Sequence, residues 1–199
     1  MQHPSLHADN TPDDEYFRCL GEFVHAFTKT ETMLYWYCGL LVGASPDVTA
    51  IVIRDQRAAG LIDMAKGLCI ATAQPAIVQT EVTRVLEHLK SINTFRTGLI
   101  HHMPAESDDW GRIVIDPRTP THQQLKVKSV SSETLKGIIA DLFVIGLHVQ
   151  AFSIALTTNS SEHFAERRDA DYRLHEVWKF NAARQHVELV MESNLPLER

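Results

Sequence analysis

An arginine and a histidine, Arg96 and His101, stand five positions apart at the end of a long apolar repeat. A guanidinium binds phosphates and carboxylates, and an imidazole exchanges protons near neutral pH. The apolar residues before them recur at alternating steps of four and three, as on one face of a helix, at Val78, Val82, Val85, Leu89 and Ile92. Arg96 takes the next place in this series. Because burying an unpaired arginine is costly, we expect it to meet a carboxylate, a phosphate or a water-filled cleft.

The two side chains do not share one face of a straight helix. At about 100° per residue, His101 lies about 140° around the helix axis from Arg96. They converge on one ligand only if the helix end bends, or if two copies of this helix face each other.

The motif has a wider context in the sequence INTFRTGLIHH, residues 92–102. An arginine, four residues and a histidine at the end of a bundle helix resemble the R-x(4–6)-H signature of the HEPN family. The resemblance is close over residues 92–101 and loose over the layout of residues 12–158. The family usually has Asn, Asp or His directly after the arginine, and this chain has Thr97.

The resemblance implies a metal-independent ribonuclease without a cofactor, whose site lies between the two subunits of a homodimer. RNA supplies its own nucleophile, the 2′-OH, so a proton acceptor and a positive charge suffice. Arg96 would hold the phosphate and His101 would transfer protons, leaving a 2′,3′-cyclic phosphate and a 5′-OH. Asn93, Thr97 and His102 would support them. The family context is that of toxins and phage defence, with an antitoxin or regulatory protein as a possible partner.

A second interpretation gives these residues a structural role and no catalytic role. Arg96 pairs with Glu31, at the edge of the core in the first helix, and His101 and His102 interact with the negative end of their helix. The chain is then a catalytically inactive HEPN-like dimeric module that binds a protein or nucleotide partner. In the active interpretation, Glu31 instead orients Arg96 or a catalytic histidine.

A metal site is not expected. Glu22 and His25 have the Glu-x-x-His spacing of di-iron bundles, but such sites need a second copy of this motif, and the sequence contains none.

The amino-acid composition of the chain argues against several classes of protein. The chain has 199 residues, enough for one domain with a real core, and its 22% of charged residues indicates a globular protein. A net charge of −6 argues against coating nucleic acid non-specifically, which needs a broad basic surface. Cys19, Cys38 and Cys69 are interpreted as reduced core residues of a cytoplasmic protein. We expect no signal peptide, and no membrane span in residues 138–156, where Asp141 and His148 interrupt the apolar run.

The predicted fold is an all-α bundle of about four long helices over residues 11–158, after a disordered N-terminus at 1–10. A hydroxyl cap, Pro12 and two acids start the first helix, which runs to about residue 42. Three further helical patterns cover residues 47–73, residue 75 to the motif, and residues 131–156. A turn at 54–57 could divide the first of these.

Two further segments complete the prediction. A small β-hairpin over residues 110–130 follows the third helix, and a helical tail covers 161–199. The hairpin carries four basic residues, Arg112, Arg118, Lys126 and Lys128. They are candidates for contact with an RNA backbone, although basic residues also serve solubility and edge protection in surface hairpins.

Overall fold

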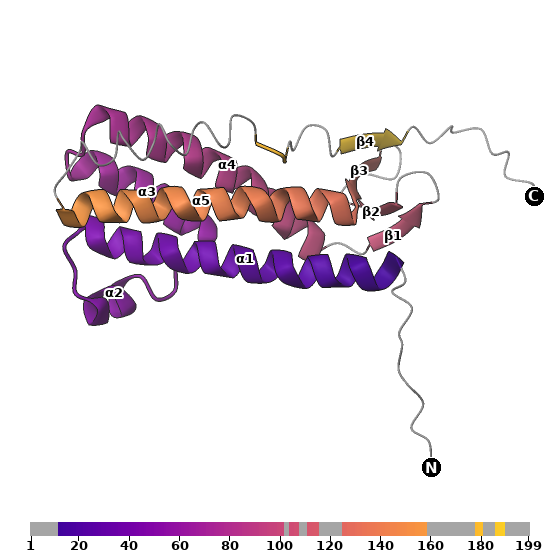
Figure 1. Cartoon of the computed structure of the whole chain (residues 1–199), viewed down its shortest axis with the longest axis horizontal. Helices are drawn as coiled ribbons and strands as arrows, with labels where there is room; N and C mark the ends of the chain where they lie inside the picture. The colour runs from indigo at the N-terminus through magenta and orange to yellow at the C-terminus, as the bar shows by residue number, and fades with distance from the viewer. Residues whose placement is uncertain are drawn as a thin grey trace, which may run out of the picture.

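The computed structural model describes residues 12–101, 104–107, 111–115, 125–158, 178–180 and 186–189. The all-α class predicted from the apolar repeats is confirmed by the helical body in Figure 1. Its five helices are α1 (Pro12–Leu41), α2 (Pro46–Val52), α3 (Ala58–Ala71), α4 (Ala76–His101) and α5 (Ser132–Thr158).

Four of these helices close around one core. α1 packs against α5 and α3, and α4 packs against α3 and α5, so each has two neighbours. The residues that point inward are those of the four–three repeats, and the largest fully buried side chains include Phe23, Phe27, Tyr37, Phe152 and Ile92. Burial of these apolar side chains is the main favourable term in forming the bundle.

The second predicted helical region is divided in two. α2 starts at the N-cap Ser45, whose Oγ accepts a hydrogen bond from the backbone N–H of Val48 at 3.4 Å. It ends at Val52, and a turn over residues 53–57 leads into α3. The sequence places the division at 54–57. α2 lies against α1 because Gly39 has no side chain, and a Cβ there would collide with Thr49.

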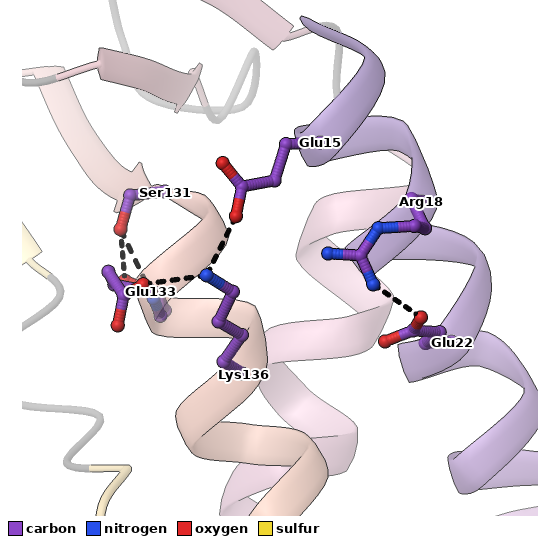
Figure 2. A network of polar contacts seen from close by, with 7 residues as sticks. Glu15, Arg18, Glu22, Ser131, Glu133 and Lys136 are labelled. Carbon is purple, nitrogen blue, oxygen red and sulfur yellow. Dashed lines mark hydrogen bonds and ion pairs between the residues drawn. The ribbon is translucent and has the colours of Figure 1, made fainter. Parts of the chain in front are cut away.

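A polar network joins the start of α5 to α1 (Figure 2). Ser131 caps α5 by accepting a hydrogen bond from the backbone N–H of Thr134 at 3.1 Å. Lys136 Nζ then bridges Glu15 of α1 at 2.7 Å and Glu133 at 2.8 Å. The ammonium of Lys136 lowers the pKa of Glu15, and the two carboxylates raise the pKa of Lys136.

Short strands lie at the end of the bundle where α4 ends and α5 begins (Figure 1). They are β1 (Pro104–Ser107), β2 (Gly111–Ile115), β3 (Leu125–Val130) and β4 (His186–Leu189), in the order β1-β2-β3-β4, and all neighbours are antiparallel. The sequence predicts only two strands, over 110–130. The strands β1 and β4 lie outside that range and are not predicted from the sequence. The turn at 116–124, with Arg118, lies outside the described residues.

The C-terminal region differs from its prediction wherever it is described. A helical tail is expected over 161–199, but residues 178–180 are not helical and His186–Leu189 is a strand. The backbone N–H groups of Lys179 and Phe180 donate to Asp141 of α5, and β4 pairs with β3. Partners far along the chain therefore override the local helical composition. The other residues of the tail and residues 1–11 lie outside the described residues.

One helix in the described part of the chain, α5, is long and apolar enough to cross a membrane. Core helices of globular bundles have the same length and composition, and α5 packs against α1 and α4. Asp141 and His148, two of the polar residues that interrupt its apolar run, are buried inside the bundle.

Candidate functional site

Arg96 lies in the last third of α4, in the row of residues that faces the core. Its Cζ is 4.7 Å from the centroid of the Phe27 ring, so the guanidinium covers an aromatic face of α1. Its Nε is buried and has no hydrogen-bond partner, and among the described residues it is the single side-chain nitrogen or oxygen in that state. A cation–π contact does not satisfy an N–H group. The residue that interrupts the apolar repeat thus keeps unused capacity to donate a hydrogen bond.

Glu31 does not pair with Arg96 in the described structure. Its side chain is half-buried on α1, one turn after Phe27, whose ring Arg96 covers. Among the described residues no ion pair joins Arg96 to any acid, Glu31 included. The ion pair between Arg96 and Glu31 that the second interpretation of the sequence requires is therefore not formed among these residues.

Asn93 and Thr97 flank Arg96 on α4. Asn93 is half-buried and lies one turn before the arginine, where residues three apart are neighbours on a helix surface. Thr97 is exposed, and its hydroxyl donates to the backbone carbonyl of Asn93 at 2.9 Å. The proton of the Thr97 hydroxyl is thus used inside the helix, while its oxygen lone pairs stay open to a donor.

The histidines of the motif are only partly described. His101 is the last residue of α4, and its side chain lies outside the described part. His102 lies outside it altogether. The structure brings together Arg96, Phe27, Asn93 and Thr97, and the convergence of Arg96 with His101 stays a prediction.

The strand register shows which residues stand opposite the basic residues that are candidates for contact with RNA. Arg112 of β2 stands opposite Glu106 of β1, and Lys126 of β3 stands opposite Glu188 of β4. Lys128 stands opposite Val114 on one side and His186 on the other. Two of the basic positions thus have an acidic neighbour from outside 110–130.

The sequence analysis missed a polar centre around Asp141 of α5. This carboxylate is 3% exposed, and its Oδ2 lies 2.9 Å from Nε2 of His88 on α4. It also accepts the backbone N–H groups of Lys179 and Phe180 at 3.0 and 2.8 Å. An acid inside an apolar repeat was the available signal. Its partners were not predictable, because two of them lie nearly forty residues away.

Grooves occur on the α1/α5 side of the bundle. One, of about 590 Å³, is lined by residues that include His25, Lys29, Met33 and Phe143. A second, of about 390 Å³, is lined by residues that include Lys136, Asp141, Phe143 and Trp178. Arg96 lines neither of them. These two grooves are therefore separate from the arginine of the motif.

The Glu22–His25 spacing does not produce a metal site in the described structure. Glu22 Oε1 pairs with Nη1 of Arg18 at 2.7 Å (Figure 2). Among the described residues, no three His, Cys, Asp or Glu side chains lie together in a way that could hold a metal ion.

Comparison with known proteins found no matching family model, and no curated protein or solved structure with significant similarity. The functional argument therefore depends on the residues and their geometry, together with the resemblance of the motif.

Proposed function

We propose that this chain is a HEPN-like ribonuclease that cleaves RNA without a metal, at a site shared by the two subunits of a homodimer. The observation that carries the proposal is that the buried Nε of Arg96, five residues before His101, has no hydrogen-bond partner in the described part of the chain. Arginine binds phosphate through several N–H groups at once, and a bound phosphodiester would give this Nε its missing acceptor.

The proposed reaction is a transesterification within the RNA. His101 removes the proton of the 2′-OH, the 2′-oxygen attacks phosphorus, and the bond from phosphorus to the 5′-oxygen breaks. His102, as the second acid or base, protonates the leaving 5′-oxygen. The products are a 2′,3′-cyclic phosphate and a 5′-OH, and no metal or cofactor takes part. Arg96 offsets the negative charge that grows on the phosphate oxygens.

The homodimer is part of the proposal because of the helix geometry. On one straight helix, Arg96 and His101 point about 140° apart. Two copies of α4 about a two-fold axis place an arginine of one subunit near a histidine of the other. Glu31, one turn from Phe27, would orient a catalytic histidine, and His102 would serve as a second acid or base.

The segment after α4 belongs to the same proposal. We infer a β-hairpin insertion over residues 110–130, with Arg112, Arg118, Lys126 and Lys128 directed to the RNA backbone beside the motif. Because basic side chains that neutralise phosphates release counterions, RNA binding would weaken as the salt concentration rises. From the resemblance we place the protein in the cytoplasm, as a toxin or phage-defence ribonuclease with an antitoxin or regulatory protein as partner.

A second candidate is a catalytically inactive HEPN-like module that binds a protein or nucleotide partner. It is favoured by the strand register, which places an acidic residue, Glu106 or Glu188, opposite Arg112 and Lys126. The use of the Thr97 hydroxyl within the helix favours it too.

End-labelled RNA incubated with the purified protein and EDTA distinguishes the two candidates. We expect the wild type to cleave, and both Arg96→Ala and His101→Ala to lose about 100-fold or more in rate, the contribution typical of a positioned acid or base. Arg18→Ala is the matched control, because it removes an exposed guanidinium of α1. Intact RNA with the wild-type protein would reject the ribonuclease in favour of the binding module.

A further inference from the structure

The polar centre at Asp141 fixes a short segment from the far end of the chain, residues 178–180, which we name the C-terminal clasp. Oδ1 of Asp141 accepts the backbone N–H of Lys179 at 3.0 Å, and Oδ2 accepts that of Phe180 at 2.8 Å. Oδ2 also lies 2.9 Å from Nε2 of His88. A carboxylate only accepts hydrogen bonds, so Asp141 ties the clasp and α4 to α5 at one point.

The aromatic residues of the clasp lie along α4. The ring of Trp178 stacks on the imidazole of His88, with centroids 4.2 Å apart and planes at 14°. It also lies under the guanidinium of Arg84, at 5.4 Å from Cζ to the ring centroid. Phe180 is buried and contacts Phe95 edge to face, with centroids 5.1 Å apart. The clasp therefore contacts α4 from residue 84 to residue 95.

These contacts end beside the arginine of the motif. Phe95, which Phe180 contacts, directly precedes Arg96, whose guanidinium covers Phe27 of α1. The last third of α4 thus has the clasp on one side and α1 on the other. A rotation of this helix would move Arg96 off Phe27 and Phe95 off Phe180 at once.

We propose that the C-terminal clasp sets the rotation of α4 at the motif, and that Asp141 and Phe180 are positioning residues for Arg96. The catalytic part of this inference rests on the proposed ribonuclease function. The structural part, that the clasp orders the motif end of α4, is tested without any RNA.

Asp141→Asn is the first variant. An amide has one acceptor oxygen and one NH₂ group, so in either orientation the NH₂ faces a backbone N–H that the carboxylate accepts. We expect hydrogen exchange, followed by mass spectrometry, to speed up by about tenfold or more at residues 178–180 and 93–101. The cores of α1 and α3 should exchange as in the wild type.

A second pair of variants keeps the test decisive if Asp141→Asn does not fold. Phe180→Ala removes the contact with Phe95, and Phe180→Leu keeps an apolar side chain there. We expect faster exchange at 93–101 in the alanine variant and nearly wild-type exchange in the leucine variant. Phe143→Ala is the control, because Phe143 follows Asp141 by two residues on α5 and is 65% exposed. Faster exchange at 178–180 alone, with 93–101 unchanged, would overturn the inference.

RNA cleavage adds the catalytic readout. A positioning role predicts that kcat falls by about tenfold in Phe180→Ala, while KM changes by less than about twofold, and that Phe180→Leu recovers most of kcat. Equal kcat in all variants, with exchange at 93–101 accelerated, would overturn the positioning role. A wild-type protein that cleaves no RNA would reject the ribonuclease proposal instead, and the exchange data would still decide whether the clasp orders α4.

Discussion

The guanidinium of Arg96 on α4 lies over the ring of Phe27 on α1, with 4.7 Å between Cζ and the ring centroid. This contact holds the arginine at the inner face of the bundle, while its Nε stays buried without a hydrogen-bond partner among the described residues. An unsatisfied buried donor costs about 1–3 kcal/mol, and a cation–π contact returns about 0.5–2 kcal/mol. The net contribution of Arg96 to the free energy of unfolding is therefore close to zero. This is expected of a residue whose proposed role is to bind a ligand rather than to stabilise the fold.

Arg96→Met tests this balance. Methionine is apolar and flexible, so it fills the same space without a polar atom to satisfy. We expect the free energy of unfolding to stay the same or to rise by up to about 2 kcal/mol, while RNA cleavage is lost. Urea denaturation followed by circular dichroism measures the change, and Arg18→Met, at an exposed position, should shift stability by less than about 0.5 kcal/mol. A loss above about 2 kcal/mol would make Arg96 a structural residue.

A mixture of two inactive variants tests the shared site. When Arg96→Ala and His101→Ala subunits exchange freely, half of the dimers are mixed, and each mixed dimer has one complete Arg96–His101 site. We therefore expect about a quarter of the wild-type rate to return if arginine and histidine come from different subunits. Sites built within one subunit would give no recovery. The readout is cleavage of labelled RNA before and after subunit exchange, and analytical ultracentrifugation establishes that dimers are present.

The helices and the unusual place of Arg96 were predictable from the sequence, because both depend on local periodicity. The four–three repeat that ends at Ile92 puts Arg96 in a core row, and the structure buries its Nε. The break near residues 54–57 was signalled by a cluster of polar residues. Each of these features is decided by residues within a few turns of one another.

The clasp and the outer strands were not predictable, because they depend on partners distant in the chain. Asp141 meets Lys179, which lies 38 residues later, and β4 pairs with β3 across a still longer stretch of chain. The composition of residues 162–191 favours a helix, and tertiary hydrogen bonds decide otherwise at 178–180. Likewise, the acids that oppose Arg112 and Lys126 are found only from the strand register.

Thiol reactivity provides a check on the packing of α1 against α3. Cys19, Cys38 and Cys69 are free and buried, and burial raises the pKa of Cys38 to about 12. Burial also raises the pKa of Cys69, whose Sγ lies 3.0 Å from the hydroxyl of Tyr37. The thiolate is the reactive form, so we expect no alkylation by iodoacetamide at pH 8 in the native protein. All three should react together in denaturant, as mass spectrometry would record, and rapid labelling of one native thiol would contradict this packing.

The ion pair between Lys66 of α3 and Glu87 of α4, at 2.6 Å, predicts a small dependence of stability on pH. The hydrogen bond from Lys66 lowers the pKa of Glu87, and that from Glu87 raises the pKa of Lys66. A lowered carboxyl pKa stabilises the fold above the unfolded value of about 4.3, and this part is lost as pH falls through the folded pKa. A raised ammonium pKa stabilises below about 10.4 and is lost as pH rises through the folded pKa.

Glu87→Gln should therefore lower stability most between about pH 5 and pH 10, and should match the wild type in strong acid. The difference is about 0.5 kcal/mol, because solvent screens a pair whose carboxylate side is more than half exposed. Thermal denaturation across this pH range measures it. Asp55→Asn is the matched control, since Asp55 is an exposed acid without an ion pair among the described residues, and its curve should run parallel to the wild type. A difference between Glu87→Gln and wild type that persists unchanged at pH 3 would show that Glu87 acts through packing rather than through its charge.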